Sequence, residues 1–382
     1  MALRRTLHLL FNLAVFGVCY TLANLAAQRA GVTREIVFGI DSAIPFVPWM
    51  VLPYMTSGAL FVASFCRARD PARLGARVLF ATVAGTLVFV LYPLRFGAAR
   101  PLVEPALPAA LFDLLALVDQ PYNQFPSLHV AYCLIFATVL RGALVRMWLA
   151  LVALSTLFTW QHHLIDVAGG LLLGAAAIAL VRRPGVAFYY ATGAVLVALV
   201  FPWPLSLYPA AIAFAYARGD ADFLRKRGGR YPLSILLLYW PYLLGYWLTW
   251  QAVRVVEKLP FRYLSPQLIV GRRLAAGEAA TLPPGCAVID LANELSETPA
   301  LRGPYYEHIP MLDLAAAPMD AIERAADAVA RHIDAGRIVY LHCAMGYSRS
   351  IFIANFYLDR RRDDHFDLPA QATLSATAAP PA

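Results

Sequence analysis

Long apolar segments separated by short polar stretches dominate the first half of the chain. A membrane-spanning helix needs about 20 mostly apolar residues, and runs near that length occur at 6–28, 46–66, 78–95, 128–147, 147–162 and 164–181. Residues 186–217 and 232–252 are also apolar, although prolines interrupt both. The second of these could cross the bilayer or lie in its interface. The pattern predicts a multi-pass α-helical membrane domain.

Basic residues between the apolar runs predict the orientation of this domain. They precede the first run or fall in alternate loops: Arg4, Arg5, Arg67, Arg69, Arg73, Arg77, Arg141, Arg146, Arg182 and Arg183. The positive-inside rule then predicts a cytoplasmic N-terminus. The loops 29–45, 96–127 and about 161–164 face the other side, which is the periplasm if this is a cell inner membrane. Basic residues after 252 favour a cytoplasmic C-terminal domain, whereas a crossing at 232–252 would place that domain outside.

From about residue 262 the pattern changes to short strand-like runs that alternate with helical spacing. The predicted strands are 268–271, 287–291, 306–310 and 337–342, and the predicted helices are 319–335 and 348–361. Such alternation is typical of an α/β domain with a mainly parallel sheet. We therefore divide the chain into an N-terminal helix and loop (1–40), a membrane catalytic domain (41–185), additional transmembrane or interfacial helices (186–256), an α/β domain (257–367) and a disordered tail (368–382).

Composition agrees with a membrane protein that carries a soluble part. Hydrophobic residues make up 60% of the chain and charged residues 15%, against about 45–50% and about 25% in soluble domains. The net charge of +8 follows from the arginines between apolar runs, so we predict no nucleic-acid partner. The five cysteines fit neither a zinc site nor a disulfide framework. We predict no metal and no other cofactor.

Polar residues gather at one end of the predicted helical hairpin 128–162. His129 begins one run and His162 ends the next, so both emerge on the same side of the bilayer. Asp166 follows His162 by four residues and shares its helix face. A carboxylate there would fix the tautomer of the imidazole and leave its other nitrogen as a nucleophile or base. The alternative is a pair of histidines that only anchor helices at the interface, but ionisable residues near a membrane usually mark function.

These residues resemble the type 2 phosphatidic acid phosphatase (PAP2) superfamily over about residues 40–185. The resemblance is carried by Phe-Pro-Ser-Leu-His at 125–129 and by His162-x-x-x-Asp166. It implies a PAP2-like helical bundle, with His162 as the phosphoryl-accepting nucleophile and Asp166 as its partner. It also implies that His129 protonates the leaving group, with Ser127 at the substrate.

Two departures from the family pattern bear on the reaction. The hydrolases of the family usually carry Lys-x6-Arg-Pro, whereas this chain has Arg100-Pro101 but Pro93 at the lysine position. Arg95 is the substitute we expect, so Arg95 and Arg100 are the predicted phosphate-binding residues. The Ser-Arg pair expected before the last histidine is Ser155-Thr156. Without that arginine the triad is similar to sphingomyelin synthases and inositol phosphoceramide synthases, which transfer a phospho-headgroup to a lipid alcohol.

A second set of chemical residues follows the predicted strand 337–342. Cys343 and Arg349 form a Cys-x5-Arg motif between a strand and a helix. Backbone N–H groups at such a helix N-terminus make an anion site, and the same field favours the thiolate. Arg349 can hold two phosphate oxygens, Gly346 permits the tight turn, and Ser350 could assist release of the thiolate. The alternative is a structural cysteine with an incidental arginine.

This motif resembles the dual-specificity group of cysteine-dependent phosphatases, over about residues 262–362. The resemblance implies a general-acid aspartate about thirty residues before the cysteine, and Asp313 lies 30 before it (343 − 313). Asp290 and Asp320 are rivals, of which the first ends a strand and the second begins a helix. Family domains usually continue with further helices after the motif, whereas here the chain soon reaches the low-complexity tail.

The whole arrangement is similar to bacterial fusions of a PAP2 domain with a dual-specificity phosphatase. It implies a lipid phosphatase or headgroup transferase joined to a phosphomonoesterase, whose substrate is a phosphorylated lipid or a phosphoprotein. Three other interpretations stay open. They are a protein phosphatase anchored by an inactive membrane domain, a non-enzymatic phosphate-binding module, and a transporter, whose polar residues would be expected nearer the bilayer midplane.

Overall fold

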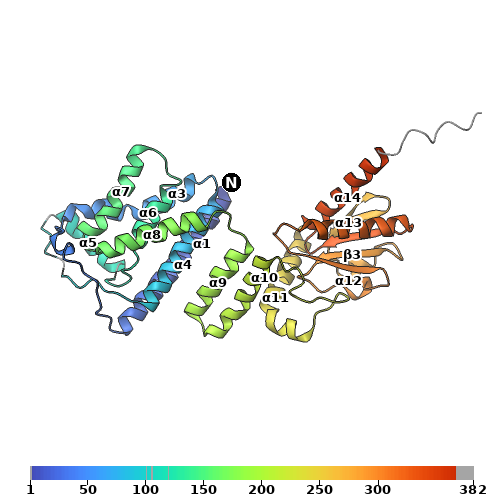
Figure 1. Ribbon diagram of the computed structural model, residues 1–382, viewed down its shortest axis with the longest axis horizontal. Coiled ribbons are helices and arrows are strands. Elements are labelled where there is room, and N and C mark those ends of the chain that lie inside the picture. Colours follow the sequence, from blue (N-terminus) through green and yellow to red (C-terminus); the bar gives the residue numbers. More distant parts are fainter. Residues whose placement is uncertain (1, 100, 105, 119, 367–382) are drawn as a thin grey trace, which may run out of the picture. The chain divides into compact units, whose positions relative to one another are not determined.

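The computed structural model describes residues 2–99, 101–104, 106–118 and 120–366. Two compact units make up the chain, Met1–Ala210 and Ala211–Ala382 (Figure 1). Arg100 and the predicted tail 368–382 lie outside the described residues.

The N-terminal unit is helical. Its elements are α1 (Ala2–Arg29), η1 (Asp41–Ala43), η2 (Pro48–Met50), α2 (Val51–Met55), α3 (Ser57–Arg67), α4 (Pro71–Leu91), α5 (Ala106–Val118), α6 (Leu128–Phe136), α7 (Ala143–Phe158), α8 (Leu164–Leu180), α9 (Val186–Val200), η3 (Trp203–Ser206) and the first residues of α10 (Leu207–Arg218). Three helical segments are long and apolar enough to cross a membrane: Ala2–Arg29, Pro48–Arg67 and Pro71–Leu91. They indicate a membrane protein.

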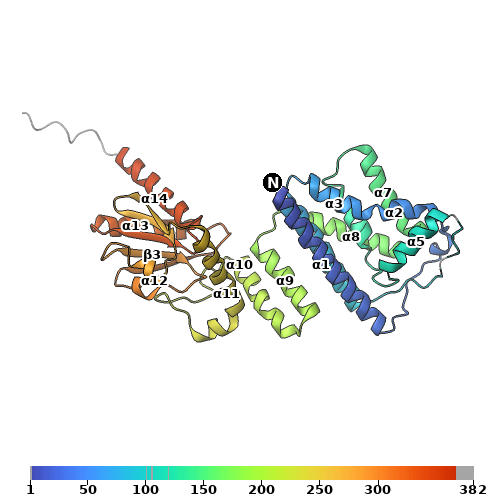
Figure 2. The ribbon, with the colours of Figure 1, turned by 180° about the vertical axis from the view of Figure 1, so that it is seen from behind.

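Local chemistry fixes where the long helices begin and how they pack. At the start of α4, Asp70 accepts a hydrogen bond from the backbone N–H of Arg73 at 3.0 Å, and Pro71 occupies the first helical position. Both are favoured at helix N-termini. α1 lies along α4, as Figures 1 and 2 show from opposite sides. Phe65, Val78 and Ala131, from three different helices, belong to the apolar core of this unit.

Glycines on α8 bring α6 close enough to form a site. A Cβ atom at Gly170 would lie 2.4 Å from the carbonyl oxygen of Ser127, and one at Gly174 would lie 2.9 Å from that of Ala131. Only glycine allows such a close approach of two helix backbones. The start of α6, with His129, is therefore held against the start of α8, with Asp166.

Two predicted elements of this unit differ from the structure. The run 128–147 does not form one long helix, because α6 ends at Phe136. Tight i to i−3 hydrogen bonds follow, from Thr138 N to Ile135 O at 3.1 Å and from Val139 N to Phe136 O at 2.9 Å. The predicted loop 96–127 contains α5. The predicted helix at 164–181 is confirmed as α8.

The C-terminal unit contains a five-stranded sheet in the order β1-β2-β5-β3-β4. The strands are β1 (Phe261–Ser265), β2 (Leu268–Arg272), β3 (Ala287–Ala292), β4 (Tyr306–Met311) and β5 (Val339–Cys343). β1 pairs antiparallel with β2, and the other three pairings are parallel. The predicted α/β class is thus confirmed, and β1 is an edge strand that the sequence pattern did not indicate.

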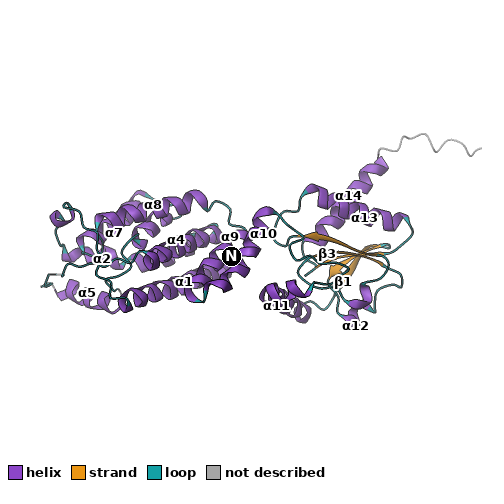
Figure 3. Cartoon of the chain, turned by 60° about the horizontal axis from the view of Figure 1, so that its bottom comes forward, coloured by secondary structure: helices purple, strands orange, loops and turns teal. Residues whose placement is uncertain are grey.

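Helices cover both faces of this sheet (Figure 3). α13 (Met319–Asp334) and α14 (Arg349–Phe366) pack on one face, against side chains such as Val270, Ile289 and Leu341. α12 (Ala276–Ala279) and η4 (Pro299–Leu301) cover the other face, where the alternating neighbours Ile269, Val288 and Tyr340 lie. This alternation follows from the two-residue period of a strand.

The segment between α10 and α11 (Leu233–Val256) is bound to the loops that follow β3. The hydroxyl of Tyr231 donates to the carbonyl of Asn293 at 2.6 Å, and the Asn293 side chain donates to the carbonyl of Ala221 at 2.7 Å. α11 itself is kinked at Tyr239, two residues before Pro241, because proline disrupts a helix interior. The predicted division at residue 257 stays a prediction.

A buried lysine reinforces this attachment. Lys226 Nζ lies 2.5 Å from Asp290 Oδ2 and donates to the carbonyl of Ala292 at 2.7 Å, and both charged side chains are fully buried. Burial would raise the pKa of Asp290, but Lys226 and His342 outweigh burial and hold that pKa below its usual range. Asp290, Glu297 and His342 offer ligand atoms within 4.8 Å of one another. We interpret this cluster as a network of ion pairs and not as a metal site, because the Lys226 ammonium already supplies a positive charge beside Asp290.

We expect Lys226→Met to destabilise the C-terminal unit by about 3–5 kcal/mol, because it leaves Asp290 charged and buried without its partner. Hydrogen exchange of the β3 and β5 amides in the full chain would measure the change. Lys258→Met, at an exposed lysine, is the matched control. The double variant Lys226→Met with Asp290→Asn should recover much of the loss. Equal exchange in the two single variants would show that the buried pair is not needed.

Candidate active sites

The Cys343 site lies at the edge of the sheet where parallel strands end. Cys343 is the last residue of the central strand β5. The neighbouring strand β3 runs in the same direction, and so does β4 on the far side of β3. Glu294 follows β3, and Asp313 follows β4. Carboxyl ends of parallel strands meet at one edge, which is where ligands bind in open α/β sheets. Sheet order therefore brings together residues that are distant in the sequence.

Hydrogen-bond donors surround the sulfur of Cys343. The backbone N–H of Gly346 donates to Sγ at 3.3 Å, and the Ser350 hydroxyl lies 3.4 Å from it. Gly346 has a φ of +78°, and a Cβ there would lie 2.8 Å from the backbone nitrogen of Arg272, so only glycine fits this turn. The loop then enters α14 at Arg349. Gly346 and Ser350 thus both lie beside the sulfur, and their roles in a reaction stay predictions.

The surroundings of Cys343 favour its thiolate. Burial opposes ionisation of the thiol, but the charge of Arg349 and the hydrogen bonds from Ser350 and Gly346 outweigh burial and lower the pKa of Cys343. The contrast with Cys286 is direct, since burial raises the pKa of that thiol to about 11. A thiolate is the nucleophilic form of cysteine.

Acceptors hold the Nη atoms of Arg349, whereas its buried Nε has no hydrogen-bond partner within the described part of the chain. Its Nη1 donates to the carbonyl of Met311 at 2.7 Å and to Glu294 Oε2 at 3.1 Å, and its Nη2 lies 3.3 Å from Asp313 Oδ1. Among the described residues, none accepts a hydrogen bond from Nε. Burial lowers the pKa of Arg349, but Glu294 more than offsets it, so the guanidinium stays charged. The Nε edge can therefore bind an oxyanion.

Of the three candidate aspartates, only Asp313 is placed beside Arg349. Besides that contact, its Oδ2 accepts a hydrogen bond from the Tyr246 hydroxyl at 3.1 Å. Asp290 is buried against Lys226. Asp320 lies in the first turn of α13 and pairs with Arg324 at 2.5 Å.

Two residues of this site were not predicted from the sequence. Glu294, which holds Arg349, lies in an irregular stretch after β3, where no motif marks it. Tyr246, which holds Asp313, lies in the apolar run 232–252 and precedes the predicted domain. A polar hydroxyl within such a run was the one available signal.

The second site lies in the N-terminal unit, where the two predicted histidines meet. The ring centroids of His129 and His162 are 6.3 Å apart. His162 Nδ1 lies 3.5 Å from Asp166 Oδ2, which also accepts a hydrogen bond from the backbone N–H of His163 at 2.8 Å. The backbone N–H of Ser127 donates to the carbonyl of Asp166 at 3.0 Å. The three side chains thus come together from the start of α6, the start of α8 and the stretch before α8. The prediction that His162 and Asp166 share one helix face is wrong, because α8 begins at Leu164, after His162.

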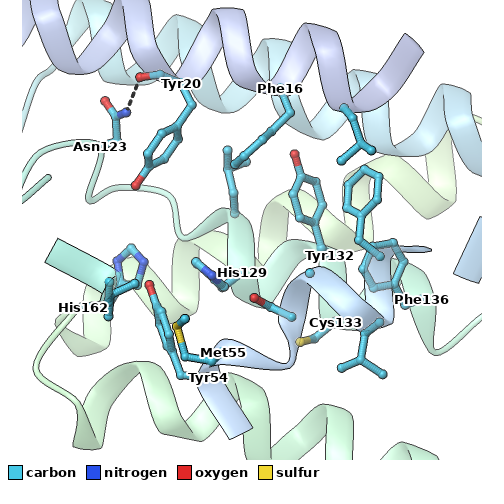
Figure 4. A pocket seen from close by; sticks show the side chains of 17 residues that line it. Phe16, Tyr20, Tyr54, Met55, Asn123, His129, Tyr132, Cys133, Phe136 and His162 are labelled. Atoms are coloured by element: carbon cyan, nitrogen blue, oxygen red, sulfur yellow. Dashed lines mark hydrogen bonds between the residues drawn. The ribbon is translucent and has the colours of Figure 1, made fainter. Parts of the chain in front are cut away.

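An apolar cavity of about 330 Å³ adjoins the two histidines. Figure 4 shows His129 and His162 near one another at this cavity, with Tyr54 beside them. The ring of Tyr54 lies 4.5 Å from that of His129. Most residues that line the cavity are apolar, including Phe16, Leu60 and Phe136. Neither the cavity nor Tyr54 was predicted, because both depend on how distant helices pack.

The predicted phosphate-binding residues of this second site are less closely gathered. Ser127 is buried and caps α6, since its hydroxyl accepts a hydrogen bond from Val130 N at 3.5 Å. The backbone N–H of Arg95 donates to the carbonyl of Arg34 at 2.8 Å, and the described contacts do not join its side chain to either histidine. Arg100 is not among the described residues. Its role and that of Arg95 stay predictions.

Comparisons with protein-family models, curated proteins and solved structures find no match to this chain.

We expect alkylation of Cys343 by iodoacetamide to rise with pH through a midpoint below the ordinary thiol pKa of about 8.5. Cys286 should rise only towards pH 11, and mass spectrometry of the separate peptides would distinguish the two. Ser350→Ala removes a hydrogen bond to the sulfur and should move the Cys343 midpoint upward. Ser348→Ala, at an exposed serine of the same loop, should not. A Cys343 midpoint at or above that of Cys286 would contradict the lowered pKa.

Proposed function

We propose that the chain is a membrane enzyme with two phosphoryl-transfer sites, of which the Cys343 site hydrolyses phosphate monoesters. One observation carries this proposal. A buried arginine, fixed by Glu294 and Met311, leaves its Nε edge without a protein partner beside a thiol of lowered pKa. A structural cysteine would need neither the donors around its sulfur nor an arginine held in this way.

The geometry supports a two-step reaction. The Cys343 thiolate attacks phosphorus and the bond to the ester oxygen breaks, while Asp313 gives its proton to the departing alkoxide. Water then attacks the phosphocysteine, Asp313 takes a proton from that water, and the thiolate leaves as inorganic phosphate is released. Arg349 and the backbone N–H groups of the loop stabilise the charge on the phosphoryl oxygens. The Ser350 hydroxyl is placed to stabilise the departing sulfur.

For the membrane site we propose PAP2-type chemistry. His162 attacks the phosphoryl group of a lipid, Asp166 orients its ring, and His129 protonates the leaving alkoxide. Water or a lipid alcohol then accepts the phosphoryl group from His162. The approach of the two histidines supports this proposal, as does the apolar cavity beside them, which suits an acyl chain. With Thr156 where the hydrolases have arginine, transfer to a lipid alcohol is as well supported as hydrolysis.

The same proposal includes a location. Three membrane-length helices favour an integral membrane protein. Arginines between the apolar runs favour a cytoplasmic N-terminus in a cell inner membrane, with the His162 site facing the periplasm and the Cys343 site in the cytoplasm. The substrates on this view are phosphorylated lipids, with a phosphoprotein as the other class for the Cys343 site.

Asp313→Asn should separate substrates by their leaving groups. Phenyl phosphate releases a basic phenolate that needs a proton, so its kcat/KM should fall by about 10²–10⁴. p-Nitrophenyl phosphate releases a weakly basic phenolate and should lose far less. Both reactions would be followed by phosphate release from the full chain.

Two control variants make this comparison decisive. Asp320→Asn, at an exposed aspartate paired with Arg324, should leave both rates near those of the unsubstituted chain. Cys343→Ser should abolish both. An equal loss on the two esters in Asp313→Asn would remove Asp313 from the role of general acid.

The membrane site can be tested in a Cys343→Ser background, where the second site is silent. In proteoliposomes, His162→Ala should abolish phosphate release from phosphatidic acid and headgroup transfer to a diacylglycerol. His129→Gln should lower either rate by about 10²–10⁴, the usual contribution of a general acid. His8→Gln, at a histidine of α1 that does not line the cavity, is the matched histidine control. Lipid turnover that survives His162→Ala would favour an inactive membrane anchor.

A further inference from the structure

One face of α11 forms part of the Cys343 site. The Tyr246 hydroxyl donates to Asp313 at 3.1 Å, and Trp250 Nε1 donates to the carbonyl of Arg273 at 2.8 Å. The Trp250 ring also packs with Leu295 and with Ala344 of the Cys343 loop. The middle and end of this helix are therefore fixed against the α/β region, which a helix spanning a bilayer could not be.

The opposite face of α11 is apolar and exposed. We call it the outward stripe; it consists of Leu237 (70% exposed), Trp240 (60%), Leu244 (43%), Trp247 (45%) and Leu248 (54%). These positions recur every three or four residues, so they share one side of the helix. A continuous apolar surface of this kind marks an interaction site.

Charge at the two ends of α11 indicates what covers this stripe. Exposed basic residues lie before the helix and after it: Arg225, Arg230, Lys258 and Arg262. Anionic lipid headgroups attract such residues, and tryptophan prefers the membrane interface. If α11 crossed the bilayer, its two basic ends would lie on opposite sides, against the positive-inside rule. A helix lying in the plane of the bilayer keeps both ends on the same side.

We propose that the outward stripe of α11 lies in the interface of an anionic lipid bilayer, so that the Cys343 site works at the membrane surface on phosphate monoesters of lipids. The choice of substrate rests on the proposed phosphatase function, whereas the position of α11 does not. One face of the helix thus lies in the membrane interface, and the opposite face contacts residues of the Cys343 site. Its attachment through Tyr246 links the two.

Spin labelling of the full chain in anionic nanodiscs tests the position. A label at Leu244→Cys should be relaxed by oxygen, which concentrates in lipid, and little by a water-soluble nickel chelate. A label at Met319→Cys, an exposed apolar residue at the start of α13, should show the reverse. Both labels are placed in a Cys66→Ser, Cys343→Ser background, which removes the exposed cysteine and the reactive one.

Each outcome of the labelling decides the question. Access of the nickel chelate to both labels would overturn the proposal by placing the stripe in water. Access of neither reagent to position 244 would overturn it as well, because a protein surface would then cover the stripe, either from this chain or from a second copy. The labels need no catalysis, so this result is independent of whether Cys343 is a nucleophile.

A kinetic comparison tests the substrate class in chains that retain Cys343. Leu244→Glu with Trp247→Glu places charge in the stripe. The ratio of turnover on phosphatidic acid vesicles to turnover on soluble p-nitrophenyl phosphate should fall by about tenfold or more, because the loss of even one of the two apolar side chains from lipid costs about that factor. His162→Ala in all samples removes the membrane site. Met319→Glu should leave the ratio unchanged. An unchanged ratio in the stripe variant would overturn the proposal that the substrate is a lipid. Absence of turnover on both substrates before any stripe substitution would instead overturn the proposed phosphatase function.

Discussion

The buried guanidinium of Arg349 is the interaction on which the Cys343 site depends. A buried cation is costly unless acceptors converge on it, and here they come from the ends of two other strands, as Glu294 after β3 and Asp313 after β4. The order β5-β3-β4 makes this possible, because it places the ends of β3 and β4 on the same side of the strand that carries Cys343. The same cation lowers the pKa of the thiol. One side chain thus joins the loops after two strands and lowers the pKa of the thiol on a third.

The Cys-x5-Arg spacing alone predicts that Cys343 and Arg349 share one loop. Asp313 was chosen through the family resemblance, and the structure places it beside Arg349 at the same edge. The catalytic roles of these residues stay predictions. Glu294 was not predicted, because its partner is 55 residues away and no local pattern requires an acid there. Tyr246 was not predicted, because an apolar run that contains tryptophan and tyrosine is typical of a transmembrane or interfacial helix.

The membrane unit shows the same division. His129 and His162 could be paired from hairpin topology alone, and their rings do approach. What topology could not give is the cause of that approach, which is the absence of side chains at Gly170 and Gly174 on α8. Nor could it give the length of α6, since the chain turns through local hydrogen bonds at Thr138 and Val139 before α7 begins at Ala143. Tertiary packing, not hydropathy, decides both.

α11 shows why hydropathy alone leaves the topology of such a chain ambiguous. A helix that is apolar on all sides normally spans a membrane or fills a core, and the 232–252 segment satisfies that description. In the structure, Tyr246 and Trp250 use one side of the helix to bind the α/β region, while Trp240 and Leu244 use the other side to face outward. The two faces of one apolar helix can therefore lie in different surroundings. Where a candidate site of an α/β region includes residues of such a helix, the surroundings of the opposite helix face constrain where any substrate of that site would lie.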